Sequence, residues 1–261
     1  MAKLKVHSVK YNFIMNFILT ASGFIFPLIT FPYVSVVLGA TSNGIVSFVA
    51  SYSAYFLMVA QLGVPTYGVR ACARVRDDKE KLSKTAQEIF IINIIMSILV
   101  LAAYILSIFL IPELAENRTL LLIYSSTIIM NSFGMEWLYR AIEQYDYITI
   151  RSLIFKLISI GLMFAFVHSP SDYIMYAITI LIAQIGSYVI NFARARKFIT
   201  FKPFKHYNLK RHIKPLLLLF SQSVAISIYT NSGSSKRSSG LSKYFSITSL
   251  IVRSPENSFC K

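Results

Sequence analysis

The chain has 261 residues, of which 55% are hydrophobic and only 14% are charged, whereas soluble domains carry roughly 25% charged residues. This composition excludes an ordinary soluble globular domain and indicates a protein of the lipid bilayer. The net charge of +15 raises nucleic acid as a partner, so the placement of the basic residues has to decide between the two. Cys72 and Cys260 are far apart and have no supporting His or Cys ligands, which indicates incidental thiols.

Long apolar stretches occupy most of the chain from its start to about residue 230. A helix needs about 20 mostly apolar residues to cross a hydrocarbon core about 30 Å thick. Seven stretches reach or approach that length, so the predicted fold is all-α, a polytopic transmembrane helix bundle of about seven spans. The predicted spans are residues 13–38, 44–69, 86–111, 119–140, 150–168, 173–193 and 213–230.

The basic residues alternate between the connections. Lys and Arg collect in cytoplasmic loops of membrane proteins, and a cytoplasmic N-terminus places twenty of them on the inner side. The outer connections, GATSN, PELAENR and HSPSD, hold only Arg118. This asymmetry predicts a cytoplasmic N-terminus, and it argues against nucleic acid because the charge is divided among separate loops.

Two segments differ from the spans. Residues 194–214 interleave basic and aromatic side chains, which suits either a segment at an anionic membrane surface or a charged linker between two bundles. Residues 232–261 are one-third serine and contain no apolar stretch of bilayer length. We expect a change of reading frame near Asn231 to explain this tail, in preference to a disordered secreted appendage.

Few ionisable residues fall within the spans, and each is a candidate functional residue because burying charge in lipid is costly. Glu136 and Arg140 are four residues apart on one helix face and can pair. Arg70, Arg140, Arg151 and Lys156 predict a ring of cations at the inner mouth of a cavity, suited to a diphosphate gripped by paired Arg donors. Glu136 is the fifth candidate substrate-binding residue. The alternatives are a topology anchor for Arg70, an interfacial pair for Glu136 and Arg140, and a snorkelling side chain for Lys156.

The first span contains two prolines, Pro27 and Pro32. Proline removes a backbone hydrogen bond and bends a helix, so a kink is predicted here. Interrupted helices are common in transporters, although a kinked helix is also ordinary in membrane bundles.

Enzyme signatures are missing from the sequence: there is no H-E-x-x-H, P-loop, G-x-S-x-G or GxGxxG motif. Asp77 and Asp78 lie in a basic, solvated loop, which indicates a charged surface and not a metal site. We therefore expect neither enzymatic activity, nor a metal, nor a cofactor.

Four stretches in the same order resemble bacterial polysaccharide-repeat flippases, the Wzx-type O-antigen transporters. They read FPYVSVVLGATSNGIVSF, AQLGVPTYGVRACARVRDDKEKLSK, EWLYRAIEQYDYITIRSLIFKLISI and PLLLLFSQSVAISIYTN. Members of that family are similar to multidrug and toxin extrusion transporters. The resemblance implies a multi-pass protein of the bacterial inner membrane that moves undecaprenyl-diphosphate-linked oligosaccharide from the inner to the outer leaflet. The implied partners are membrane lipid, this substrate, and glycan polymerase and chain-length proteins.

The resemblance also implies a division of the chain: a six-helix first lobe over residues 1–193, a linker over 194–214, and a seventh span over 215–231 that starts an incomplete second lobe. The sequence departs from the family by stopping after this span, whereas members are expected to have twelve or more. An inactive product is one expectation that follows. A small-molecule or drug exporter and a nonfunctional membrane fragment are the alternatives.

Overall fold

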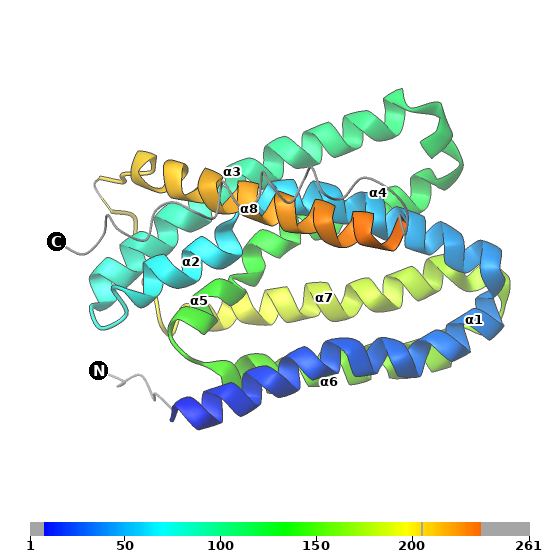
Figure 1. Cartoon of the computed structure of the whole chain (residues 1–261), viewed down its shortest axis with the longest axis horizontal. Helices are drawn as coiled ribbons and strands as arrows, with labels where there is room; N and C mark the ends of the chain where they lie inside the picture. Colours follow the sequence, from blue (N-terminus) through cyan, green and yellow to red (C-terminus); the bar gives the residue numbers. More distant parts are fainter. Residues whose placement is uncertain (1–7, 205, 236–261) are drawn as a thin grey trace.

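The computed structural model describes residues 8–204 and 206–235, and this part of the chain is built from helices with no strand. The all-α prediction is confirmed. The long apolar segments form the long helices, and Figure 1 shows them side by side in one bundle. The helices are α1 Val9–Gln61, α2 Val64–Ala73, α3 Lys79–Leu110, α4 Arg118–Gly134, α5 Glu136–Ala141, α6 Tyr145–Phe166, α7 Tyr173–Ala195 and α8 Lys210–Ser235, with short 3-10 helices η1 Pro112–Asn117 and η2 Pro170–Asp172.

Helix α1 contains the first predicted span and most of the second. The chain reverses within it at Gly39, whose backbone is not helical (φ 70°, ψ 178°). Glycine adopts this positive φ without a Cβ clash, so the predicted outer connection is a sharp kink instead of a loop. Pro27 and Pro32 lie inside α1 with helical backbone angles. The Thr30 hydroxyl donates to the carbonyl of Phe26 next to Pro27 at 3.1 Å, and a proline-induced bend stays a prediction.

Two predicted spans are broken into a long and a short helix. The second span is interrupted at Leu62 (φ 43°) and Gly63 (φ 74°), where α1 ends and α2 begins. The fourth is interrupted at Met135 (φ 40°), between α4 and α5. The Asn191 side chain on α7 donates to the carbonyl of Gly134 at 2.6 Å, which satisfies a backbone group that the second break leaves free.

Four helical segments of the described chain are long and apolar enough to cross a membrane: Val9–Ala73, Lys79–Leu110, Tyr145–Phe166 and Pro170–Ala195. The first spans 65 residues and includes the reversal at Gly39. With 17 residues, α4 falls short of the length needed to cross alone. The number of spans therefore stays a prediction, as do the division into lobe and linker and the orientation in the membrane.

The connections gather at two ends of the bundle (Figure 1). We call the end that holds residues 74–78, 142–144, 196–204 and 206–209 the cation-rich end, and the end that holds Gly39, η1 and η2 the cation-poor end. The uneven division of Lys and Arg in the sequence is thus matched by a division in space. Of the predicted tail, residues 232–235 continue α8, and the remainder lies outside the described residues.

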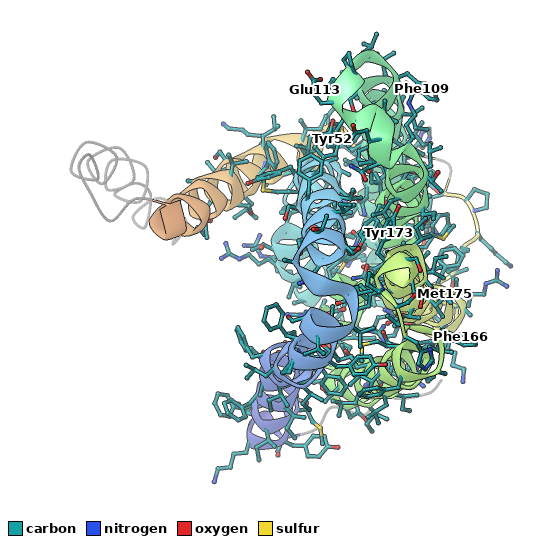
Figure 2. All side chains as sticks on the ribbon, turned by 90° about the vertical axis from the view of Figure 1, so that its right-hand side faces the viewer. Tyr52, Phe109, Glu113, Phe166, Tyr173 and Met175 are labelled. Atoms are coloured by element: carbon teal, nitrogen blue, oxygen red, sulfur yellow. The ribbon has the colours of Figure 1, made fainter. Side chains whose placement is uncertain are left out.

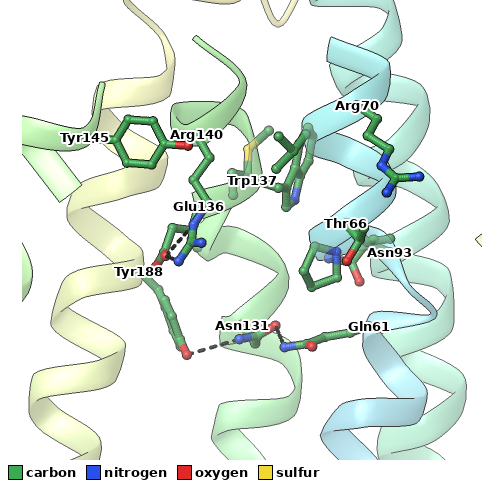
Figure 3. Close-up of a pocket in the computed structure, with 15 residues that line it drawn as sticks. Gln61, Thr66, Arg70, Asn93, Asn131, Glu136, Trp137, Arg140, Tyr145 and Tyr188 are labelled. Carbon is green, nitrogen blue, oxygen red and sulfur yellow. Dashed lines mark hydrogen bonds and ion pairs between the residues drawn. The ribbon is translucent and has the colours of Figure 1, made fainter. Parts of the chain in front are cut away.

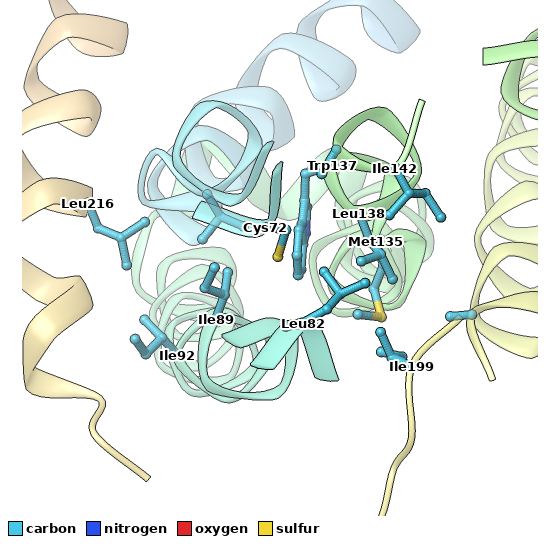
Figure 4. Close-up of a cluster of buried hydrophobic side chains, with 14 of the residues drawn as sticks. Cys72, Leu82, Ile89, Ile92, Met135, Trp137, Leu138, Ile142, Ile199 and Leu216 are labelled. Carbon is cyan, nitrogen blue, oxygen red and sulfur yellow. The ribbon is translucent and has the colours of Figure 1, made fainter. Parts of the chain in front are cut away.

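Buried apolar side chains form separate clusters toward the two ends. The cluster at the cation-rich end, drawn in Figure 4, joins α2, α3 and α5 to the start of α8 through residues such as Cys72, Leu82, Leu138 and Leu216. A second cluster surrounds Tyr104, which is 0% exposed, nearer the cation-poor end. Many large apolar side chains instead point outward, as expected of helices that face lipid.

Two side-chain contacts at the cation-rich end join the start of α1 to two of the connections. The Asn12 amide near the start of α1 donates to Glu143 Oε2 at 3.3 Å. The other oxygen of Glu143 pairs with Arg76, which follows α2. Glu143 lies between α5 and α6, so this single carboxylate ties together the start of α1 and the connection from α2 to α3.

Candidate functional site

A cavity of about 570 Å³ opens among helices α1 to α7 (Figure 3). The breaks that separate α1 from α2 and α4 from α5 lie at its wall, so the short helices α2 and α5 supply much of its lining. Its volume is in the range of ligand sites, about 300 to 1,000 Å³. The lining residues are Gln61, Val64, Pro65, Thr66, Val69, Arg70, Asn93, Asn131, Gly134, Met135, Glu136, Trp137, Arg140, Tyr145 and Tyr188.

Helices α2 and α5 approach closely because Gly68 has no side chain. A Cβ atom at Gly68 would lie 2.7 Å from the indole ring of Trp137. The ring therefore packs closely against α2 at Gly68, and Trp137 is only 6% exposed. This contact fixes the spacing between Arg70 on α2 and the charged residues of α5.

Three of the five predicted site residues line this cavity: Arg70, Glu136 and Arg140. Arg140 grips Glu136 Oε1 through Nε at 3.1 Å and Nη2 at 2.7 Å, as the four-residue spacing predicted. Arg70 is exposed to the cavity, and its guanidinium makes no hydrogen bond or ion pair with any residue that the structure describes. The Arg70 guanidinium is therefore available to bind an anionic group.

The fourth predicted residue, Arg151, lies behind Glu136 on α6. Its Nη2 is 3.6 Å from Glu136 Oε2, and its side chain is only 6% exposed. The Nε and Nη1 atoms are buried and make no hydrogen bond within the described part of the chain, while the guanidinium lies 5.8 Å from the ring centre of Tyr147. Glu136 is thus shared by two arginines, one at the cavity wall and one beneath it.

Lys156 lies elsewhere, so the structure does not bring all the predicted cations to one mouth. It lines a second cavity of about 350 Å³ between α1, α6 and α7, together with Pro27. Its Nζ donates to the Ser22 hydroxyl at 2.7 Å and lies 5.4 Å from the ring centre of Phe26. The predicted ring is therefore reduced to Arg70, Arg140 and the adjoining Arg151.

Sequence reasoning missed a row of polar side chains across the first cavity. The Gln61 amide donates to Asn131 Oδ1 at 3.0 Å, and the Asn131 amide donates to the Tyr188 hydroxyl at 3.1 Å (Figure 3). The row links α1, α4 and α7. Its signal in the sequence is weak, since it consists of single amides within otherwise apolar stretches.

Charged groups outside the spans also show specific contacts. The Asp78 carboxylate caps α3 by accepting from the backbone N–H groups of Glu80 and Lys81, both at 3.1 Å. The backbone N–H of Lys81 and the Lys81 ammonium lower the pKa of Asp78. Among the described residues, no three His, Cys, Asp or Glu side chains come together as metal ligands.

Known protein families and individual proteins include relatives of this chain. The family model described as Polysaccharide biosynthesis protein matches residues 9–235. A protein of Escherichia coli (strain K12), provisionally named O-antigen transporter, is 25% identical over 165 residues, which cover 63% of this chain and 40% of that protein. A protein of Shigella dysenteriae with the same provisional name is 23% identical over 224 residues, which cover 85% of this chain and 56% of that protein.

The chain thus spans about half the length of the curated relatives that it matches. No solved structure matches it. The relatives confirm the resemblance seen in the four quoted stretches, and the family match extends over every helix of the described fold. The chain therefore belongs to the polysaccharide biosynthesis protein family.

Proposed function

We propose that this chain takes part in moving undecaprenyl-diphosphate-linked O-antigen or other polysaccharide repeat units across the bacterial inner membrane, with its N-terminus in the cytoplasm. The observation that carries the proposal is the cavity near the cation-rich end that both Arg70 on α2 and Arg140 on α5 line. Two relatives provisionally named O-antigen transporter support the class of cargo.

The chemistry of the lining suits a lipid-linked diphosphate. Guanidinium groups present paired N–H donors that match phosphate oxygens. Arg70 has no partner among the described residues, while Glu136 holds Arg140 at the wall. In this proposal Arg70 makes the first contact with the diphosphate. The polar row of Gln61, Asn131 and Tyr188 offers hydrogen-bonding groups to a sugar.

The second cavity gives Lys156 a separate role. The side chains of Gln184 and Tyr188 are four residues apart on α7, so they share one helix face. Gln184 lines the second cavity and Tyr188 the first. We place Lys156 further along the path of the anionic group, past the row of amides.

The chain contains a built-in probe of the site. Trp137 is its single tryptophan and lines the cavity, so its fluorescence reports there. We expect geranyl diphosphate, added to the full chain in detergent, to change Trp137 emission saturably, whereas geraniol does not. Arg70→Gln and Arg140→Gln should each weaken binding about tenfold, the loss expected for a charge-assisted contact.

Arg74→Gln is the matched control, because Arg74 is exposed one turn after Arg70 and does not line the cavity. Equal binding by the parent chain and a double Arg70→Gln, Arg140→Gln variant would overturn the site. Transport is tested by expressing this chain in a strain that lacks its O-antigen flippase. Restored surface glycan supports the function, and absence of glycan with normal membrane insertion contradicts it for this chain.

A further inference from the structure

Helix α2 faces two parts of the molecule. Pro65, Thr66 and Arg70 line the cavity, whereas Gly63 and Tyr67 contact α8. A Cβ atom at Gly63 would lie 2.8 Å from the backbone N of Phe220 and 2.9 Å from the carbonyl oxygen of Leu216 on α8. Since α2 is a ten-residue helix between two turns, a displacement of one face moves the other.

A group of polar residues fixes the first turn of α8 to α2 and α3. Glu88 on α3 is 0% exposed, and its carboxylate accepts from the backbone N–H of Asn208 at 2.8 Å. It also contacts His212 Nε2 at 2.8 Å and the guanidinium of Arg211. The other ring nitrogen of His212 lies 2.7 Å from the Tyr67 hydroxyl. We call Tyr67, Glu88, Asn208, Arg211 and His212 the clasp.

The connection that leads into the clasp is bound to α3 as well. The backbone N–H of Thr200 donates to the Ser83 hydroxyl at 2.9 Å. The Gln87 amide donates to the carbonyl of Lys202 at 3.2 Å and accepts from the Tyr207 hydroxyl at 2.6 Å. This basic segment is therefore docked on the bundle by polar contacts, and α8 starts from a defined point.

Beyond its first turns α8 has few neighbours in the described structure. Figure 2 shows it running away from the other helices. Leu216 and Leu219 of α8 are buried against the bundle, whereas Leu217 is 50% exposed, Leu218 66% and Ile226 55%. The clasp and the Gly63 contact consequently set the direction of α8.

We infer that the direction of α8 and the shape of the cavity are coupled through α2, with Tyr67 and Glu88 as positioning residues. Tyr67 and Arg70 are three residues apart on α2, so they are neighbours on the helix surface. A tilt of α8 that pulls on Tyr67 displaces Arg70 relative to Arg140. The same displacement moves Gly68 against Trp137, because these residues are in close contact.

The coupling is tested first without ligand, in the full chain in detergent. Glu88→Gln removes the charge at the centre of the clasp, and Tyr67→Phe removes only the hydroxyl that contacts His212. The distance between spin labels at Ser221→Cys on α8 and Ser171→Cys in η2 reports the direction of α8, in a Cys260→Ser background. Cys72 is 0% exposed, so it reacts little with the label.

In both variants we expect a broader or shifted distance distribution together with a shift of Trp137 emission. Glu80→Gln on α3 and Lys210→Gln on α8 are matched controls, since both side chains are exposed and neither belongs to the clasp; they should change neither readout. Movement of α8 without a change in Trp137 emission would overturn the coupling. So would a lower unfolding temperature in Tyr67→Phe with both readouts unchanged, which is the result of a purely structural role.

A second arm rests on the proposed function. Geranyl diphosphate should shift the label distance in the parent chain, and by linkage Glu88→Gln should change its dissociation constant about fivefold. If geranyl diphosphate binds and leaves the distance unchanged, the coupling is contradicted. If it does not bind the parent chain at all, the proposed function fails, and the ligand-free arm still decides the coupling.

Discussion

Of the five described residues with positive φ, four lie in the half of the molecule that holds the cavity, and three of those, Leu62, Met135 and Glu143, are not glycine. The cation-poor end has only Gly39, where such a backbone is easy to adopt. Non-glycine residues in this region cost free energy and persist when surrounding contacts hold them. The comparison teaches that the cation-rich half uses strained breaks at non-glycine residues to place charged side chains, whereas the other half makes its break at a glycine.

The polar groups of the two halves differ accordingly. In the cation-rich half, the buried or half-buried carboxylates Glu88 and Glu136 are each held by several partners. In the cation-poor half, neutral hydroxyls pair instead: Tyr104 with Ser53 at 2.8 Å, and Tyr52 with Ser107 at 2.8 Å. The following experiments test this contrast between the two halves.

The largest effect is expected for Gly68→Ala, which breaks the close approach of α2 and α5. The added methyl group would lie 2.7 Å from Trp137, and overpacking of this kind costs about 2 kcal/mol. Thermal unfolding in detergent should show the loss, with a shift in Trp137 emission. Gly44→Ala in the other half is the control, because nothing lies within 4 Å of its Cβ position. Equal stability of the two variants would contradict a tight contact between α2 and α5.

The second effect concerns charge at the cavity. Glu136→Gln removes the negative charge that neutralises Arg140 and Arg151, so the cavity becomes more positive. We expect geranyl diphosphate to bind about tenfold more tightly, since partly buried charges at short range interact by more than 1 kcal/mol. Titration of Trp137 fluorescence measures this change, with Glu113→Gln at the cation-poor end as the control. Weaker binding would show that Glu136 acts mainly by holding Arg140 in place.

The third test breaks the hydroxyl pairing of the cation-poor half. Tyr104→Phe leaves Ser53 and the carbonyl of Leu121 without their partner, and a buried unsatisfied polar group costs about 1 kcal/mol. Unfolding should move to a lower temperature while Trp137 emission and geranyl diphosphate binding stay unchanged. Tyr173→Phe, a half-buried tyrosine of the same half, is the control. An effect of Tyr104→Phe on ligand binding would contradict the separation of the two halves.

The smallest effect is a pH dependence at the start of α3. The pKa of Asp78 is lowered by the backbone N–H of Lys81, so its charged form stabilises the folded chain at neutral pH. This contribution is present above the ordinary carboxyl pKa of about 4 and is lost as the pH falls through the lower value of the folded state. Asp78→Asn should therefore lower the unfolding temperature slightly at pH 7, and the difference should shrink below pH 4.

Asp77→Asn is the matched neighbour of that variant, because the Asp77 side chain is exposed and caps no helix. An equal and pH-independent shift in both variants would contradict a specific contribution of the Asp78 carboxylate as the cap of α3.

Much of the fold could be predicted from the sequence because it follows from local composition. Apolar stretches of bilayer length became α3, α6 and α7, and the position of the basic residues predicted which connections share an end. The breaks at Leu62 and Met135 could not be predicted, since both residues favour helix. The break at Met135 is stabilised by a residue that is distant in the sequence, because the Asn191 side chain donates to the carbonyl of Gly134.

The site was predictable where its residues share one helix. Glu136 and Arg140 pair as their spacing indicated, and Arg70 lies near them because α2 and α5 pack together. Lys156 was grouped with them wrongly, because the direction of a side chain on α6 depends on how that helix is rotated in the bundle. The burial of Glu88 was missed for a related reason: its partners lie about 120 residues further along the chain.

The double contact of Glu143 restricts how the first helix can move. The two halves of α1 diverge from Gly39, and at their far ends Glu143 joins Asn12 to Arg76, just beyond α2. The two halves of α1, with α2 continuing the second half, thus form a loop that is closed by the chain at Gly39 and by side-chain contacts at Glu143. Sideways spreading of the halves has to break the contacts of Glu143, whereas rotation of the first half about the line from Gly39 to Glu143 preserves both closures. For these two halves relative to each other, the closure therefore favours rotation about that line over spreading.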